Sequence, residues 1–286
     1  MKPDVKAFFH KSTYTVSYVV SDPDSRKAII IDSALDYDNA SGRTATTAAD
    51  EMIAYVKAKE YSIEWILETH VHADHLTAAP YLQKQLGGRI GIGAVVKTVQ
   101  STFKKIYNFG DDVAEDGSQF HYLFKDGETF TVGGLQIDVM ATPGHTPACI
   151  TYKIGDAAFV GDTLFMPDYG TARCDFPGGD ARTLYRSIKK ILAFPPETRL
   201  FMCHDYAPGG RDYLWETTVA EQRAKNIHIH DGVSEEEFVK MRTERDATLS
   251  MPVLIIPSIQ VNMRAGNLPE PEDNGIAYLK VPLNAL

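Results

Sequence analysis

The sequence predicts an α+β protein in which two β-sheets pack face to face and helices cover the outer sides. Two observations favour this class. Short stretches rich in β-branched and aromatic residues alternate with helical patterns along the chain, and both halves end strands in histidine- or aspartate-containing motifs. A chain of 286 residues, 44% of them hydrophobic, is also long enough to bury a large core. The alternation alone fits other layered folds as well.

The first half of the chain is expected to open with a β-hairpin. Strand-forming residues occupy 13–20 and 27–31, and a Ser-Asp-Pro-Asp-Ser turn separates them. Apolar residues at helical spacing predict a helix over 44–59. A short apolar strand over 63–69 follows, and then a helix over 75–86 that two glycines close.

The second half begins with strands and ends with helices. Glycine-containing turns separate four short strands, expected at 128–132, 135–141, 150–154 and 157–160. A helix over 180–193 ends at two prolines, and a strand over 199–203 follows it. Charged helices over 215–226 and 234–248 then lead into a proline-rich tail.

Composition narrows the class of protein. The net charge is −9 and the pI is about 5.5, which argues against a nucleic-acid binder, although a local basic pocket stays open. Three widely spaced cysteines, Cys149, Cys174 and Cys203, form neither a disulfide framework nor a cysteine zinc site. No signal-peptide pattern and no apolar run long enough for a membrane helix occur. We therefore expect a cytoplasmic enzyme that binds no nucleic acid and no membrane.

The strongest motif is His70-Val-His72-Ala-Asp74-His75, directly after the strand over 63–69. On an extended strand end, His70 and His72 point the same way because side chains alternate with a period of two. Asp74 and His75 follow once the chain turns. Imidazole and carboxylate groups are the ligands that zinc, iron and manganese accept. The other interpretation is a polar surface loop, but an apolar strand leads in and a helix follows.

Three downstream elements end strands or tight turns with further candidate ligands. They contribute His145 after Pro-Gly, Asp162 after Gly, and His204 after Cys. Each alone is a weak signal, because a single histidine at a strand end is more often an ordinary hydrogen-bonded residue. Together with the first motif they predict one metal centre on loops held by rigid strands. The remaining histidines are expected to be surface or local structural residues: His10, His121, His228 and His230.

In this order, the motifs resemble those of the metallo-β-lactamase superfamily over about residues 13–210. The resemblance implies a four-layer αβ/βα sandwich with the metal site at one edge. We expect a single domain over 1–286, in which a catalytic core (about 13–210) carries a C-terminal helical extension (about 211–286). In a dinuclear member, one metal takes His70, His72 and His145, the other takes Asp74, His75 and His204, and Asp162 bridges them.

A finer resemblance points to the persulfide dioxygenases. Two classes of the superfamily fit the sequence poorly. The commonest β-lactamases have cysteine at the position of Asp162, and diiron redox members have an acidic residue at the position of His72. The segment Gly-Thr-Ala-Arg-Cys-Asp-Phe at 170–176 is similar to a Gly-x-x-Arg-x-Asp-Phe segment of persulfide dioxygenases. The resemblance continues through segments 183–187, 204–206, 236–240 and 262–266. Two departures are a longer segment between Asp162 and Arg173, and Cys174 in place of threonine.

This resemblance implies an iron(II) enzyme that oxidises glutathione persulfide with O₂ and water to sulfite and glutathione. One iron would be held by His70, His145 and Asp162, a 2-His-1-carboxylate set that leaves coordination positions open. Four further residues would orient these ligands or hydrogen-bond bound water: His72, Asp74, His75 and His204. The sequence itself permits one metal or two.

Four residues are candidate substrate contacts. Arg173 is the first, since a guanidinium binds a glutathione carboxylate, although an ion pair with Asp175 explains it equally well. Tyr206 follows His204-Asp205 and is placed to hydrogen-bond the thiol-bearing ligand. Arg223 and Asn226 are further candidates, with a solvated helix face as the competing interpretation.

Rival functions remain open at this point. A glyoxalase-II-type thioesterase would use the same seven ligands to hold two zinc ions and hydrolyse a glutathione thioester. A lactonase is a weaker rival. A non-catalytic sensor on this fold would show a degraded ligand set, whereas every ligand position here is filled. Members of the family often form dimers, and a homodimer is expected on that ground alone.

Overall fold

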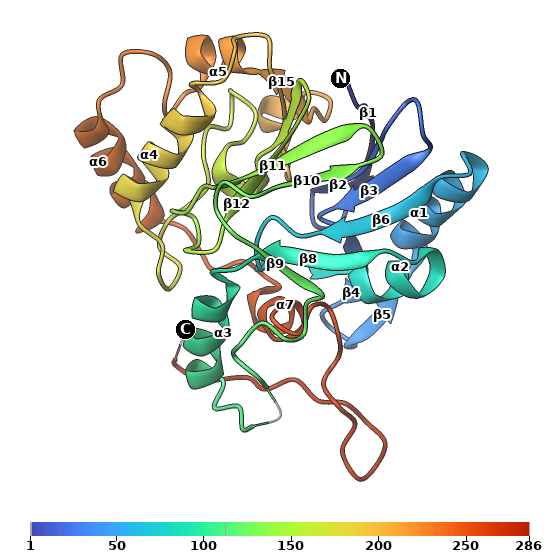
Figure 1. Cartoon of the computed structure of the whole chain (residues 1–286). Helices are drawn as coiled ribbons and strands as arrows, with labels where there is room; N and C mark the ends of the chain where they lie inside the picture. The colour runs from blue at the N-terminus through green and yellow to red at the C-terminus, as the bar shows by residue number, and fades with distance from the viewer. Residues whose placement is uncertain (1, 112, 286) are drawn as a thin grey trace.

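The computed structural model describes residues 2–111 and 113–285 as two six-stranded sheets, a small third sheet and seven α-helices (Figure 1). The first large sheet has the strand order β1-β2-β3-β6-β8-β9. Its outer part is antiparallel, and β3, β6, β8 and β9 run parallel to one another. The strands of this sheet are β1 (Asp4–His10), β2 (Thr15–Ser21), β3 (Lys27–Ile31), β6 (Ser62–Leu67), β8 (Arg89–Gly93) and β9 (Tyr122–Phe124).

The second large sheet has its strands in sequence order. Only β13 and β14 pair in parallel, and the other neighbours are antiparallel. As a result β11, β13 and β14 all run the same way and end at the same edge. The strands of this sheet are β10 (Thr129–Val132), β11 (Leu135–Ala141), β12 (Ile150–Ile154), β13 (Ala157–Phe159), β14 (Arg199–Phe201) and β15 (Glu216–Thr218).

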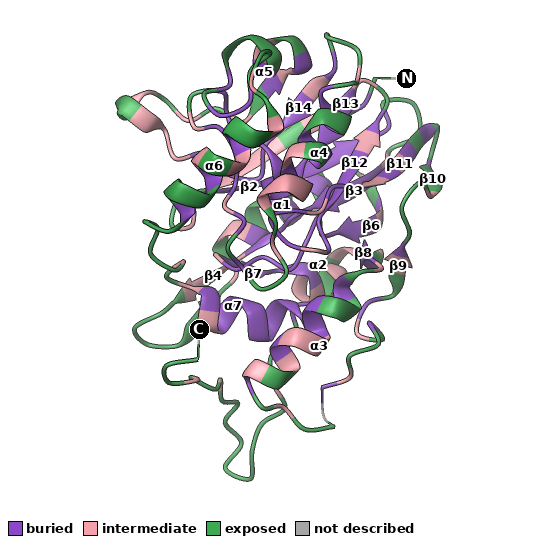
Figure 2. Cartoon of the chain, turned by 90° about the vertical axis from the view of Figure 1, so that its left-hand side faces the viewer, coloured by how far each residue is buried: buried purple, intermediate pink, exposed green. Residues whose placement is uncertain are grey.

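Alternation along the strands explains how the sheets stack. In β2, Val16, Tyr18 and Val20 belong to the core between the two sheets, whereas Val19 faces the helices on the outer side. Strand β3 repeats this pattern. Because successive side chains point to opposite faces, such fully apolar strands bury both faces of their sheet. Figure 2 shows the central strands buried throughout.

Helices complete the outer layers. Four helices pack on the outer face of the first sheet and share a hydrophobic core with it: α1 (Thr47–Ala58), α2 (Ala79–Leu86), α3 (Val96–Ile106) and α7 (Ile255–Asn262). Three helices pack on the outer face of the second sheet in the same way: α4 (Ala181–Ile191), α5 (Val219–Lys225) and α6 (Glu235–Asp246). The order helix, sheet, sheet, helix is the four-layer arrangement that the sequence predicts.

A third sheet of short strands lies beside the histidine motif. It has the order β5-β4-β7, with β4 (Ala34–Asp38) between β5 (Arg43–Ala45) and β7 (Leu76–Thr77). Strand β7 directly follows His75, so its pairing with β4 anchors the C-terminal end of the motif. The segment after His75 is therefore strand and loop up to Ala78, and α2 begins four residues later than the predicted helix.

Some other predicted elements differ from the structure. The helix predicted over 215–226 begins as strand β15, because residues 216–218 pair with β14 at the sheet edge. The proline-rich tail contains α7, which is almost entirely buried (Figure 2). Strands 135–141 and 150–154 agree with the structure residue for residue. Within the described residues, no helix is long and apolar enough to cross a membrane.

Candidate metal centre

The candidate ligands sit on loops that leave strand ends at one edge of the molecule. His70, His72, Asp74 and His75 follow β6, which belongs to the first sheet. From the second sheet, β11 leads to His145, β13 leads to Asp162 and β14 leads to His204. The two sheets therefore deliver side chains into one place, and all five histidines are at least nine-tenths buried.

Two glycines let these loops pass close to their neighbours. Gly144, before His145, has φ +140°, and a Cβ there would lie 2.3 Å from the Cα of Leu184 in α4. Gly161, before Asp162, has φ +52°, and a Cβ would lie 2.6 Å from the hydroxyl of Thr69. Both backbone angles favour glycine, and side chains at either position would collide with buried groups. The Pro-Gly-His and Gly-Asp motifs thus have a steric basis.

One group of candidate ligands consists of His70, His145 and Asp162. One ligand atom from each lies within 4.8 Å of the others. The Oδ2 atom of Asp162 lies 3.9 Å from Nε2 of His70 and 3.7 Å from Nε2 of His145. These separations are too long for hydrogen bonds and suit a small ion between the three groups. Two imidazoles and one carboxylate are the donor set that the sequence predicts for one metal.

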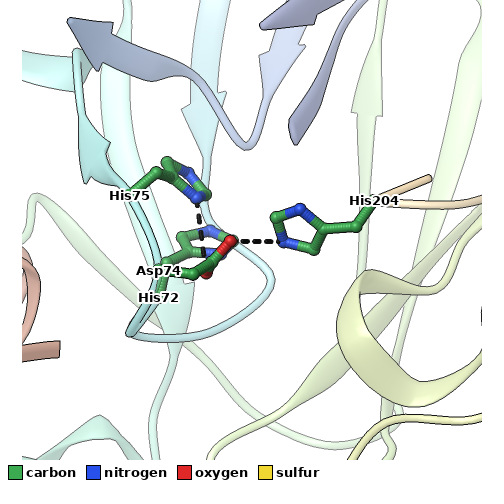
Figure 3. Close-up of side chains that lie close together, drawn as sticks. All are labelled: His72, Asp74, His75 and His204. Carbon is green, nitrogen blue, oxygen red and sulfur yellow. Dashed lines mark ion pairs between the residues drawn. The ribbon is translucent and has the colours of Figure 1, made fainter. Parts of the chain in front are cut away.

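The remaining ligands form a second group of His72, Asp74, His75 and His204, which meets the same 4.8 Å criterion. Figure 3 shows Asp74 between His75 and His204, with His72 behind it. Nε2 of His204 lies 3.0 Å from Oδ2 of Asp74 and 3.4 Å from Oδ1 of Asp162. Asp162 therefore touches both groups, as a bridging carboxylate would.

Several side-chain atoms of the two groups are buried and have no hydrogen-bond partner within the described residues. An unpaired buried polar atom is costly and is rare in native proteins. Here several such atoms converge, which is the arrangement expected of a metal site: Nε2 of His70, Nδ1 of His72, Oδ2 of Asp74, Nε2 of His75, Oδ1 of Asp162, and both ring nitrogens of His204.

The outward-facing ring nitrogens of His70, His72 and His145 do have partners, which fix how these three rings point. Nε2 of His72 lies 3.0 Å from Asp32 and 3.2 Å from Glu68, so Nε2–H donates to a carboxylate and Nδ1 faces the centre. Against the effect of burial, the same carboxylates raise the pKa of His72, so a metal at this position would displace the Nδ1 proton. Asp32 also accepts from the backbone N–H of Thr69 at 2.7 Å. Nδ1 of His145 donates to the carbonyl of Arg173 at 2.8 Å.

Asn262 at the end of α7 secures the histidine loop. Its side-chain amide donates to the carbonyls of His72 (2.9 Å) and His75 (2.7 Å), and its oxygen accepts from the backbone N–H of Thr77 (2.9 Å). Asp32, Glu68 and Asn262 were absent from the predicted site. The signals that could have identified them are two carboxylates at the ends of otherwise apolar strands, Asp32 and Glu68, since buried charges need partners.

At three of the candidate ligands, His70, Asp74 and His75, the pKa shifts favour the protonation state that binds a cation. Burial and the neighbouring imidazoles lower the pKa of His70, and the same causes lower the pKa of His75 to about 4. Burial tends to raise the pKa of Asp74, but His204 and His75 outweigh it and the net pKa is low. His70 and His75 are therefore neutral and Asp74 is ionised near pH 7, the protonation states in which these groups bind metals.

A cavity of about 510 Å³ opens onto this centre. Its wall includes the candidate ligands Asp74, His145 and Asp162, together with aromatic side chains from several loops. Three arginine residues line it as well: Arg173, Arg242 and Arg245. A small molecule with an apolar body and an anionic group matches this lining in size and charge.

Arg173 and Tyr206, two predicted substrate contacts, line the cavity. The guanidinium of Arg173 makes two hydrogen bonds of 2.6 Å to Asp175 and donates to the Ser250 carbonyl. The predicted ion pair therefore exists at the cavity wall. Tyr206 lies against Tyr169 with ring centroids 4.7 Å apart, and burial raises the pKa of its hydroxyl, which therefore stays protonated.

Arg223 and Asn226 do not line the cavity. Arg223 is exposed and pairs with Asp231, in agreement with the competing interpretation of a solvated helix face. Asn226 is fully buried, where its amide donates to the Gly170 carbonyl at 3.0 Å and its oxygen accepts from the backbone of His228. The structure therefore does not bring these two predicted substrate contacts to the cavity that Arg173 and Tyr206 line.

Comparison with known proteins adds the family context. The model of the metallo-β-lactamase superfamily matches residues 12–204. A probable metallo-hydrolase of Burkholderia pseudomallei is 59% identical over 99% of both chains. Glyoxylase B2 of Dictyostelium discoideum is 53% identical over 100% of this chain and 98% of its own length.

Persulfide dioxygenases are more distant relatives. The mitochondrial persulfide dioxygenase ETHE1 of Bos taurus is 30% identical over 92% of this chain and 88% of its own. The crystal structure of ETHE1 from Myxococcus xanthus superposes with a TM-score of 0.73 at 28% identity, covering 92% of this chain and all of that one.

Proposed function

The chain belongs to the metallo-β-lactamase superfamily, and from that premise we propose that it is an iron(II)-dependent persulfide dioxygenase. Its reaction would convert glutathione persulfide, O₂ and water into sulfite, glutathione and two protons. The similarity to persulfide dioxygenases over nine-tenths of the chain supports this reaction.

The observation that carries the proposal is the convergence of His70, His145 and Asp162 beside the cavity. Their inward-facing atoms lie within 4.8 Å of one another, and His145 and Asp162 themselves form part of the cavity wall. A 2-His-1-carboxylate set is typical of non-haem iron(II) oxygenases. A ligand in the cavity would therefore reach the metal directly.

The residues fit a metal of this kind. The unpaired Nε2 of His70 is a buried electron-pair donor for which a cation is the natural partner, and Oδ2 of Asp162 faces it at 3.9 Å. Three protein ligands leave coordination positions unused, and a bound iron(II) ion supplies redox chemistry together with room for persulfide sulfur and O₂. The carbonyl of Arg173 accepts from Nδ1 of His145 and so presents the Nε2 lone pair to the ion.

The second group of ligands would act on protons and water in this proposal. Oδ2 of Asp74 faces Nε2 of His204 at 3.0 Å, and the carboxylate of Asp74 lines the cavity. This pair can hold a proton beside the bound substrate. The ring of Tyr206 lies 6.0 Å from that of His204, so aromatic side chains cover the pair and limit water at the reacting atoms.

The cationic lining favours an anionic thiol. Glutathione carries two carboxylates, and guanidinium groups bind carboxylates with paired hydrogen bonds. Arg173 pairs with Asp175, and Arg242 pairs with Asp246, so each of these carries its own counter-ion. Arg245 lines the same cavity from α6 and is the guanidinium that we assign to a substrate carboxylate.

A glyoxalase-II-type thioesterase is the second candidate function. The observation in its favour is the complete second group of His72, Asp74, His75 and His204, whose inward atoms are as unpaired as those of the first. Seven such ligands suit two zinc ions that hydrolyse a glutathione thioester. The relatives named as a metallo-hydrolase and a glyoxylase also support it.

Loading the same protein with iron(II) or with zinc separates the two functions. The dioxygenase proposal predicts rapid O₂ uptake with glutathione persulfide in the iron form only, and loss of that uptake in His70→Ala. S-lactoylglutathione hydrolysis is measured in parallel. Thioester cleavage by the zinc form without O₂ uptake by the iron form would put the thioesterase first.

We also propose that the protein works in the cytoplasm. The three cysteines are free and buried, which suits a reducing compartment such as the cytoplasm. The single-domain organisation and the homodimer stay predictions.

A further inference from the structure

His10, at the end of β1, is a buried histidine that the metal centre does not use. Only 7% of it is exposed. Its Nε2 lies 3.2 Å from Oδ1 of Asp36 and 3.1 Å from the hydroxyl of Ser12, and its Nδ1 lies 2.7 Å from the hydroxyl of Thr13. Both ring nitrogens are therefore joined to groups that can carry a proton.

The hydroxyls beside His10 lead back to the reaction cavity. Ser12 and Thr13 both line it. The hydroxyl of Thr13 lies 2.8 Å from that of Thr15, which in turn lies 3.3 Å from Nδ1 of His75. An unbroken series of hydrogen bonds thus joins the inside of the site to His10. Because Thr13 itself lines the cavity, the series also works without any change in the protonation of His75.

The outer end of the series reaches solvent. Asp36 lies on β4, and 28% of its side chain is exposed. Its Oδ2 accepts from the backbone N–H of Ala48 at 3.0 Å, which fixes the carboxylate while Oδ1 faces His10. His10 therefore stands between hydroxyls that line the cavity and a carboxylate that water can reach.

We propose that His10 and Asp36, with the hydroxyls of Thr13 and Thr15, form a proton relay that carries protons from the reaction cavity to solvent. The inference rests on the proposed function, whose balanced reaction releases two protons for each persulfide oxidised. A proton enters at the oxygen of Thr13 while the Thr13 hydroxyl proton passes to Nδ1 of His10. The proton on Nε2 of His10 then passes to Asp36 and from there to water. A flip of the imidazole ring restores the starting tautomer before the next proton is carried.

A purely structural tie between β1 and β4 would use the same contacts, so the test must separate proton transfer from hydrogen bonding. In His10→Gln the side-chain amide still makes hydrogen bonds but cannot carry a proton. The relay predicts that the kcat for persulfide-dependent O₂ uptake in weak buffer falls about tenfold or more, within the range for a positioned proton-transfer group. KM should stay unchanged, and added imidazole should restore kcat.

Thr13→Val gives an independent variant, since it removes one hydroxyl and leaves His10 in place. The relay predicts a similar fall in kcat, and no further fall in the double variant, because both changes interrupt one series. His230→Gln is the matched control, since His230 is exposed, does not line the cavity and has its ring hydrogen-bonded to the carbonyl of Asp231. Its kcat should equal that of the wild type.

A wild-type kcat in His10→Gln, or a loss that imidazole does not restore, would overturn the relay. A wild-type protein that consumes no O₂ contradicts the proposed dioxygenase instead. The relay is then tested in the same variants on S-lactoylglutathione hydrolysis, which also releases a proton.

Discussion

Individual residues outside the ligand set prepare the ligands for a metal. Asp32 follows β3 with φ +50°, and its carboxylate holds both Nε2 of His72 and the backbone of Thr69. The Thr69 hydroxyl in turn lies 3.0 Å from Nδ1 of His70. One buried carboxylate therefore orients the rings of two histidines in the motif, one of them assigned to the iron.

Asp32→Asn should weaken metal binding by about 10–100-fold, the usual cost of losing a partner that orients a ligand. The asparagine keeps the shape of the side chain but loses its charge and replaces one of its two acceptor oxygens by a donor, so the hydrogen bonds that set the ring tautomers are weakened. Competition with a chelator measures the affinity. Asp38→Asn, an exposed change in β4, is the control. Equal affinities in the two variants would contradict this role of Asp32.

Arg245→Gln should raise KM for glutathione persulfide about tenfold while leaving kcat nearly unchanged, since a charge-assisted hydrogen bond contributes about 1.5–3 kcal/mol. Arg223→Gln provides a matched control, because Arg223 is exposed and does not line the cavity. Steady-state O₂ uptake measures both constants. A KM shift in Arg223→Gln, or none in Arg245→Gln, would refute the assignment of Arg245.

At the scale of elements, α7 acts as a support for the histidine loop. The helix is buried against the outer core of the first sheet, and Asn262 at its end is hydrogen-bonded to His72, His75 and Thr77. A segment near the C-terminus thereby fixes a motif that lies almost two hundred residues earlier.

Asn262→Ala should lower the free energy of unfolding by about 2–4 kcal/mol, because it leaves two buried carbonyls and one N–H without their partner. Denaturant unfolding of the metal-free protein measures the loss. Asn267→Ala is a suitable control, since Asn267 is exposed and bonds only to the Arg264 carbonyl. If the two variants are equally stable, α7 does not support the loop in this way.

The turn between β2 and β3 makes folding sensitive to acid. Asp22 is 1% exposed and accepts from the backbone N–H of Gly134 at 2.8 Å, which joins this turn to the β10–β11 turn of the second sheet. The Gly134 N–H and the Ser25 hydroxyl hold the pKa of Asp22 below its ordinary value. Its stabilisation is therefore present above the unfolded-state pKa and is lost as the pH falls through the folded-state pKa.

Asp22→Asn should destabilise the protein at pH 7 by about 1 kcal/mol, the ordinary value of a hydrogen bond. The difference from the wild type should shrink below about pH 4, where the wild-type carboxyl begins to be protonated. Thermal unfolding across pH measures it. A difference that does not change between neutral and acid pH would contradict the role of the charge.

For the whole molecule, the predicted four-layer sandwich is confirmed. The elements that could be predicted are those whose limits are set by neighbouring residues in the sequence. Strands such as 135–141 combine alternation with clear glycine turns, so their limits can be predicted from the sequence. Helix α7 could not be predicted in that way, because it carries Pro257 and follows Pro252, and its helical state depends on burial against a distant sheet. The same applies to β15, whose strand state comes from pairing with β14.

The candidate site, too, can be predicted from the sequence only in part. Residue types and strand ends predict all seven candidate ligands, and the structure brings these side chains together. The orientation of α5 could not be predicted from its own sequence, so Arg223 and Asn226 were assigned to a cavity that they do not reach. Arg245 and His10 also gain their roles only from the packing of α6 and β1 around the cavity.

The most direct test of the central claim is the ratio of sulfite formed to O₂ consumed when the iron-loaded protein is given glutathione persulfide. The proposed reaction predicts one sulfite for each O₂, with no sulfite under nitrogen. O₂ uptake without sulfite, or no uptake beyond the metal-free protein, would contradict the assignment of this chain as a persulfide dioxygenase.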